Sequence, residues 1–357
     1  IINRTKIYFI GQKQGVGIHR IRLGNLENRR PFEVKGLLDA KDYIYQVRSI
    51  NKADIIWVRV RPEFTTDYER QRIDRRISRY RKEGYTHIVN DISVFDNYDC
   101  KDRTFSLWKK QNLTCPNFIS FTINDITKNY NKCIDDIELF IKKYPKVILR
   151  TNNETGGNGM HILESNSSKK DIVGALKLLN TRCSKFVRKR SSTRIMAVEY
   201  ISTHDPDKFI DLYRVHICLG KIISYYAVTS KLNVFHSIDM NYEDLNRFIL
   251  INENLPSKIS KIESKILLSA KVLGCNVGAV EFFLINDEPV FLEFNPMWGG
   301  NASKLGFGPK KFRNHLEKNR SSLESRIPNI YQFTDYQLYY KSLYKGIHDY
   351  YQNNSTS

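Results

Sequence analysis

The chain has 357 residues, of which 41% are hydrophobic and 12% aromatic, and this excludes a disordered chain or a short adaptor peptide. No window approaches the roughly 18 consecutive apolar residues of a membrane span, and residues 1–30 lack the apolar core of a signal peptide, so we expect a cytoplasmic protein without membrane contact. The 57 Lys and Arg against 38 Asp and Glu give a net charge of +19, which favours anionic partners such as nucleotides, acidic substrates or nucleic acid.

The N-terminal part of the sequence predicts an α/β domain. Residues 4–10 are typical of a strand, and the following Gly11 to Gly17 segment departs from the standard nucleotide fingerprints. The unbroken apolar run 53–60 predicts a central parallel strand, and residues 87–90 predict the next one. Between them, residues 67–82 predict an amphipathic helix whose basic face is either solvated or docks an anionic partner.

The middle of the sequence predicts a further α/β unit. A helix is expected at 103–112, a strand at 117–122 and a second helix at 126–143. The apolar strands 146–150 and 160–163 enclose a polar segment with three glycines, so they predict a hairpin with a long mobile tip.

The last part of the sequence continues this alternation. A helix is expected at 169–182, and Gly274 is expected to end another at 259–273. The tyrosine-rich tail 331–351 predicts a helix that packs on the core, with base stacking or a homodimer contact as alternatives. The predicted strands are 194–201, the hairpin 211–228 with a turn at 219–221, and the hairpin of 277–284 with 289–294.

An acidic group stands at the end of the last predicted hairpin. Glu293 and Asn295 lie two residues apart and therefore share one strand face, and Glu281 on the adjacent strand can reach it. These are hard oxygen donors, which suit Mg²⁺ bound to the phosphates of a nucleotide. A solvated edge would explain Glu281 alone, but not its combination with Asn295-Pro296 and Trp298-Gly299-Gly300. The six cysteines form no C-x-x-C pair, so no zinc site is indicated.

Three arginines can supply the positive charge that phosphate oxygens need. They are Arg103, Arg150 at the end of a predicted strand, and Arg214 within the segment DLYRVH. The glycine-rich tip 154–159 could close over the phosphates with backbone amides.

In this order, the motifs resemble the ATP-grasp superfamily over about residues 100–310. The resemblance implies an ATP-grasp fold, with an N-terminal α/β pre-grasp domain followed by two lobes that clasp ATP between antiparallel sheets. The implied boundaries are 1–100 for the N-terminal domain, 101–200 for the central lid lobe, 201–330 for the C-terminal lobe with the metal site, and 331–357 for a helical tail. The matching segments are Asp102-Arg103 with LTCP, VILR with TNNETGGNG, AVEYI, DLYRVHICLGKII, GAVEFFL and EFNPMWGG.

The resemblance also implies a role for each site residue. Glu281, Glu293 and Asn295 would bind two Mg²⁺ ions, with Glu293 bridging them. Arg103 and Arg150 would contact the α- and β-phosphates, where the family most often has lysines, and Arg214 would face the γ-phosphate or an acylphosphate. The nucleotide would further contact a lid of Gly156, Gly157 and Gly159, the backbone of Glu199, Tyr200 and Ile201 at the adenine, and Asp205 or Asp207 at the ribose.

The function implied is that of an ATP-dependent carboxylate-amine ligase. A substrate carboxylate would attack the γ-phosphorus, and an amine would displace phosphate from the acylphosphate to form an amide or peptide-like bond. The basic charge favours an acidic or phosphate-bearing substrate. Alternatives are an ATP-grasp phosphotransferase and a non-catalytic protein that binds nucleotides or polyanions. His216 is either a base for the amine or a structural histidine of its strand.

Overall fold

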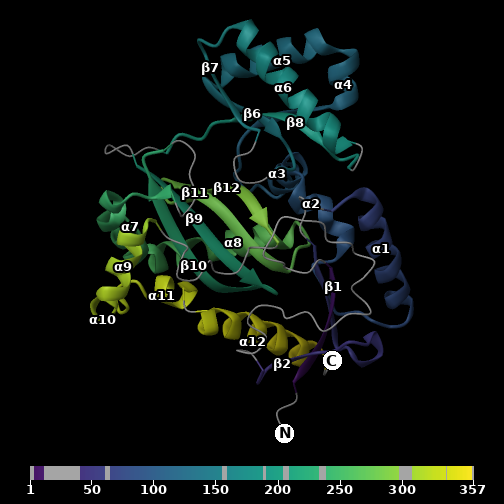
Figure 1. Ribbon diagram of the computed structural model, residues 1–357, viewed down its shortest axis with the longest axis vertical. Coiled ribbons are helices and arrows are strands. Elements are labelled where there is room, and N and C mark those ends of the chain that lie inside the picture. The colour runs from purple at the N-terminus through teal and green to yellow at the C-terminus, as the bar shows by residue number, and fades with distance from the viewer. Residues whose placement is uncertain are drawn as a thin grey trace.

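The computed structural model describes residues 4–11, 41–60, 65–154, 159–187, 190–203, 209–232, 239–296, 308–334 and 336–355. This part of the chain forms three four-stranded sheets with helices packed on them, so the predicted mixed α/β class is confirmed (Figure 1). None of its helices has the length and apolarity that crossing a bilayer requires.

The first sheet is parallel and has the strand order β2-β1-β3-β4. Its strands are β1 (Thr5–Gly11), β2 (Ile44–Gln46), β3 (Ile55–Arg59) and β4 (Ile88–Val89). Helix α1 (Asp67–Lys82) begins where Thr66 and Glu69 cap each other reciprocally, and it buries Ile73, Ile77 and Tyr80. The predicted strands and helix of this region are confirmed, whereas the segment after Gly11 lies outside the described residues. The short elements that follow or join them are η2 (Ile50–Lys52), η4 (Ile92–Val94), α2 (Phe95–Asp99) and α3 (Lys101–Lys110).

The second sheet is antiparallel and has the order β5-β8-β6-β7. Its strands are β5 (Phe118–Thr122), β6 (Lys146–Thr151), β7 (His161–Glu164) and β8 (Arg194–Glu199). One face packs against α4 (Ile123–Lys128), α5 (Tyr130–Lys143) and α6 (Lys169–Val187). The single helix predicted at 126–143 is two helices, because Asn129 has non-helical backbone angles of φ −127° and ψ 39°. The opposite face adds Met196 and Val198 to a core shared with α3 and the third sheet.

The third sheet is antiparallel and has the order β10-β9-β11-β12. Both of its hairpins were predicted, and each turns through two residues with positive φ, Leu219-Gly220 and Asn286-Asp287, which matches the twist of hairpin strands. The strands are β9 (Ile210–Cys218), β10 (Lys221–Ser230), β11 (Val277–Ile285) and β12 (Glu288–Asn295). Between the hairpins lie η6 (Tyr242–Asp244), α7 (Leu245–Glu253) and α8 (Leu255–Lys271).

The C-terminal helices cover one face of the third sheet. They are α9 (Lys310–Lys318), α10 (Arg320–Leu323), α11 (Pro328–Thr334) and α12 (Tyr336–Ser355). Helix α12 runs from the third sheet to β1 and β2 at the bottom of Figure 1. Its Tyr344 is buried with the ring 5.9 Å from that of Trp57 on β3, and Tyr339 is equally buried. The predicted packing of the tail on the core is confirmed, and these buried rings are not free to stack on bases.

All six cysteines are buried and free of disulfides. Burial raises the pKa of Cys100, Cys115 and Cys183 to about 12, so these thiols stay protonated at neutral pH.

Candidate functional site

One row of polar side chains crosses the third sheet. The strand pairing sets Tyr226 on β10 opposite Arg214 on β9, Arg214 opposite Glu281 on β11, and Glu281 opposite Glu293 on β12. Directly opposed residues of antiparallel strands project to the same face, so the four side chains share one face of the sheet. The pairing of β11 with β12 shifts immediately after Glu281, and such bulges often re-aim side chains beside active sites.

The carboxylates of this row are held by cations. Arg214 Nη1 donates to Glu281 Oε1 at 2.9 Å, and Asn295 Nδ2 lies 3.4 Å from the same oxygen. Lys101 Nζ donates to Glu293 Oε1 at 3.0 Å, although Lys101 belongs to α3 and not to the sheet. The structure therefore brings the predicted metal ligands Glu281, Glu293 and Asn295 together.

Lys101 occupies the first position of α3 and is only 5% exposed. Its backbone amide donates to the carbonyl of Asn152 at 3.0 Å. The side chain of Asn152 donates to Asp102 at 2.8 Å and accepts from the amide of Arg194 at 2.9 Å. These bonds fasten the start of α3 to the second sheet and fix the position of the Lys101 side chain.

Arg150 reaches the same place from the end of β6. Its Nη2 donates to the carbonyl oxygen of Glu154 at 2.8 Å, and Lys101 Nζ donates to that oxygen at 3.3 Å. Two cations from different elements thus converge on one carbonyl beside Glu293. We call Lys101, Arg150, Arg214, Glu281 and Glu293 the ion cluster.

The charges of the ion cluster support one another. Burial raises the pKa of Glu293, but Lys101, Arg150 and Arg214 outweigh burial and hold it below its usual value. Burial lowers the pKa of Arg150, which Glu293 and Glu154 only partly offset. For Arg214, burial is outweighed by Tyr226, Glu281 and Glu293, so its pKa is raised. At neutral pH the cluster holds an ionised carboxylate among cations.

Arg103, expected at the phosphates, does not belong to the ion cluster. It is exposed on α3, whereas Lys101, two residues earlier, is buried in the ion cluster. Two residues correspond to about 200° around a helix, so only one of the two can face the site. The sequence analysis missed Lys101, although a signal was present: Lys101 precedes the buried Phe105 and Trp108 by four and seven residues, which is the spacing of one helix face.

The segment predicted for the adenine lies at the end of β8. The amide of Glu199 donates to the Asn117 carbonyl at 2.8 Å, and that of Tyr200 donates to the Lys146 carbonyl at 3.0 Å. The Glu199 carboxylate accepts from the amide of Asn117 at 3.0 Å. Among the hydrogen bonds of the described residues none engages the amide of Ile201.

The two ends of the glycine-rich segment meet at an ion pair whose carboxylate is buried. Glu154, before the segment, is 6% exposed, and its carboxylate accepts from Arg182 Nε at 2.6 Å. Gly159, after the segment, has φ +63°, and a Cβ there would lie 2.7 Å from Glu154 Oε2. The positive φ therefore favours glycine at position 159. Gly156, Gly157, Asp205 and Asp207 lie outside the described residues.

The pair of Glu154 with Arg182 yields a stability prediction. We expect Arg182→Met to lower the free energy of unfolding by about 1–2 kcal/mol, because it leaves a buried carboxylate without its partner while Arg182 itself is partly screened by solvent. Thermal and urea unfolding would measure the loss. Adding Glu154→Gln should recover part of it, and equal losses in the single and double variants would contradict this explanation.

His216 is a structural residue of β9. It is 1% exposed, its ring stacks on Phe333 at 5.1 Å, and its Nδ1 lies 2.5 Å from Ser224 Oγ. Burial, with Arg214 nearby, lowers its pKa well below the usual value, so the ring is neutral. These contacts favour the structural interpretation over that of a base.

The residues present fit Mg²⁺ by donor type. Two carboxylates stand beside the Asn295 side-chain amide, whose Nδ2 lies 3.4 Å from Glu281 Oε1 and whose oxygen is a further hard donor. Within the described part of the chain, Arg214 Nε is buried without a hydrogen-bond partner. A buried donor of this kind needs an acceptor, which a bound anion would supply.

No protein-family model and no curated protein matches the chain. Among solved structures it is similar to a RimK domain protein ATP-grasp from Sphaerobacter thermophilus, with 10% identity, a TM-score of 0.49, and coverage of 97% of this chain and 99% of that one. It is also similar to a D-alanine–D-alanine ligase from Bacillus anthracis complexed with ATP, with 11% identity, a TM-score of 0.48, and coverage of 91% and 95%. A third is the ATP-grasp ligase PsnB complexed with a minimal precursor, at 13% identity, a TM-score of 0.44, and coverage of 82% and 91%. Two of these carry the name of the family that the sequence resembles, but similarity at this level does not specify substrates or site residues.

Proposed function

We propose that the chain is an ATP-dependent ligase of the ATP-grasp type that joins a carboxylate to an amine through an acylphosphate. The observation that carries the proposal is the ion cluster, in which three cations from three elements, Lys101 buried and Arg150 and Arg214 half-buried, surround two carboxylates. The three cations outnumber the two carboxylates, which leaves one positive charge without a partner in the cluster. Withdrawing an unpaired charge from water costs free energy, so a cluster that served only the fold would not need the extra cation. A polyphosphate would supply the missing negative charge.

In this proposal the phosphates lie between the second and third sheets. Lys101 and Arg150, with Lys101 in the role first given to Arg103, would contact the α- and β-phosphates. Arg214 would offer its buried and unpartnered Nε to the γ-phosphate. These fixed cations stabilise charge on the transferring phosphoryl group without reorganising during the reaction.

Glu281, Glu293 and Asn295 would hold two Mg²⁺ ions, with Glu293 between them. The metal would supply further charge neutralisation at the phosphates. Glu293 suits this role because its lowered pKa keeps it ionised at neutral pH. Lys101 donates to Glu293 in the structure, so it would lie beside a metal that Glu293 held.

The other residues predicted for the site are assigned to the lobes predicted from the sequence. The lobe 101–200 would supply Lys101, Arg150, the glycine lid 156–159 and the adenine contacts at 199–201, and the lobe 201–330 would supply the metal ligands. Residues 1–100 and 331–357 would form the N-terminal domain and the tail, and Asp207 would bind the ribose. The net charge of +19 favours an acidic acceptor, either a small molecule or a macromolecule.

The test is product formation. We expect the chain to release ADP and phosphate from Mg-ATP only when both an acid and an amine are supplied, with the amide found by mass spectrometry. Arg214→Gln should abolish release, while Arg326→Gln, which removes an exposed arginine paired with Glu253 on the same lobe, should not. A phosphorylated product formed without any amine would contradict the ligase and indicate a phosphotransferase.

A further inference from the structure

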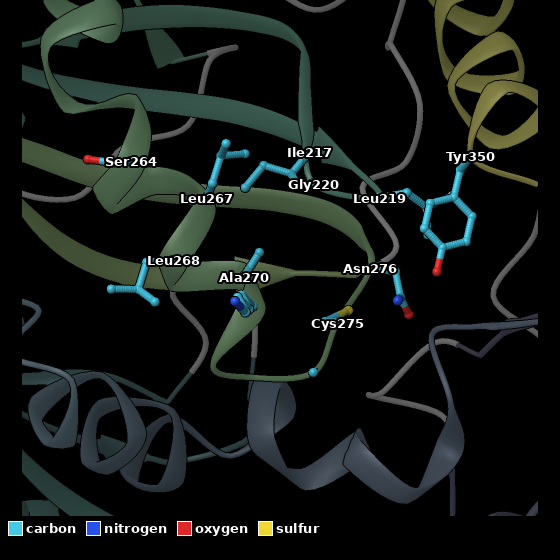
Figure 2. A pocket seen from close by; sticks show the side chains of 12 residues that line it. Ile217, Leu219, Gly220, Ser264, Leu267, Leu268, Ala270, Cys275, Asn276 and Tyr350 are labelled. Carbon is cyan, nitrogen blue, oxygen red and sulfur yellow. The ribbon is translucent and has the colours of Figure 1, made fainter. Parts of the chain in front are cut away.

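A hollow lies on the face of the third sheet opposite to the ion cluster. It has a volume of about 560 Å³ and is enclosed by α8, the β9–β10 turn, the link from α8 to β11, and α12 (Figure 2). Ile217 of β9 forms part of its wall, whereas Arg214, three residues earlier, belongs to the ion cluster. Alternate residues of a strand point to opposite faces, so the sheet separates this hollow from the ion cluster.

The wall of the hollow is apolar. Ile217 and Cys275 belong to the buried core below it, and Leu267 and Leu268 pack against that core while remaining partly exposed. In Figure 2 the side chains of Ile217 and Leu267 lie next to each other on this wall. A Cβ at Gly220 would meet nothing within 4 Å, so the turn leaves the hollow accessible.

The rim carries hydrogen-bond donors and one cation. It consists of Ser264, Lys271, Asn276 and Tyr350, with Tyr350 and Asn276 at one end of Figure 2 and Ser264 at the other. Asn276 Oδ1 accepts from the amide of Asn90 at 3.0 Å, which leaves its NH₂ group to point elsewhere. In the part of the chain that the structure describes, no hydrogen bond or ion pair engages the side chains of Ser264, Lys271 or Tyr350.

One acidic side chain beside this rim is already paired. Asp349, next to Tyr350, is paired with Lys345 at 2.6 Å. The rim therefore combines an unpaired Lys271 with amide and hydroxyl donors, all of which favour an acceptor with negative charge.

We propose that this pocket binds a small organic acid with an apolar body, whose carboxylate lies at the rim beside Lys271 and whose hydrocarbon part contacts Leu267 and Ile217. The volume falls in the range of about 300–1,000 Å³ that small-molecule sites occupy, and an apolar wall with a few polar groups is their usual composition. The site is separate from the nucleotide site and does not depend on the function proposed above.

The probes are 2-naphthoate and its neutral analogue 2-naphthalenemethanol, titrated into the full chain and followed by calorimetry or by ligand-observed NMR. We expect saturable binding of 2-naphthoate and about fivefold to tenfold weaker binding to Lys271→Glu, with little change for the neutral analogue. Ser264→Trp, which places a large ring over the mouth from an exposed helix position, should abolish binding of both probes. Thermal unfolding of each variant checks that it is folded.

Two controls keep the outcomes distinct. Lys261→Glu makes the same charge change at an exposed position of α8 outside the pocket lining and should leave both affinities unchanged. Glu293→Gln should also leave 2-naphthoate binding unchanged, because it alters the opposite face of the sheet. Absence of saturable 2-naphthoate binding, or binding unaffected by Ser264→Trp, would overturn the site, and equal binding of the acid and the alcohol in every variant would overturn the ligand class.

Discussion

Replacement of Lys101 by Met should lower kcat/KM for Mg-ATP about 100- to 1,000-fold, the usual cost of removing one charge-stabilising donor from a reacting centre. Lys101 is buried, contacts both Glu293 and the Glu154 carbonyl, and supplies a cation that no other described residue of α3 can replace from that face of the helix. Met preserves the length and apolar stem of lysine, so the change is mainly one of charge. The dissociation constant of Mg-ATP should rise in parallel.

Arg103→Met is the matched control for this experiment. It removes a cation from the same helix, two residues on, at an exposed position. We expect its kcat/KM to stay within about twofold of the wild type, because an exposed charge is largely screened by solvent. The opposite ranking, with Arg103 essential and Lys101 dispensable, would restore the first assignment and refute the geometry of the ion cluster.

Much of the fold could be predicted because its elements are marked by local patterns. The hairpins β9–β10 and β11–β12 were predicted from apolar strands around short turns, and the turn residues adopt the positive φ that such turns require. Helix α1 was predicted with its bounds from the helical spacing of its apolar positions, and the structure adds the cap at Thr66. Strand β2 was missed because it has only three residues and owes its place to β1.

Part of the candidate site was also predictable from local patterns of the sequence. Glu281, Glu293 and Asn295 share a strand face, and this follows from alternation within one hairpin. Lys101 was missed because the helix was expected to begin at residue 103, which left Lys101 outside it, whereas α3 begins at Lys101 and places it on the face of Phe105 and Trp108. Its contact with Glu293 joins positions 192 residues apart, and sequence spacing carries no information on such a contact.

The second large effect is expected from Glu293→Gln, measured as stabilisation by Mg-ATP. A ligand at 100 times its dissociation constant adds about 2.7 kcal/mol to the free energy of unfolding, and for the wild type we expect a shift of this size that requires Mg²⁺. The variant keeps the shape of the side chain but removes the charge that would bind metal. Its Mg²⁺-dependent shift should vanish.

Glu293→Gln should also destabilise the protein without nucleotide, because the buried Lys101 loses its ion pair. The two effects are separable, since the first is the difference between scans with and without Mg-ATP on the same variant. Glu288→Gln supplies the control: it removes a carboxylate from the other end of β12, where Glu288 is exposed and pairs with Lys265. It should retain the full shift. If Glu293→Gln retains the shift as well, Glu293 is not a metal ligand, and the carboxylates of the ion cluster serve only to hold Lys101 and Arg214 in place.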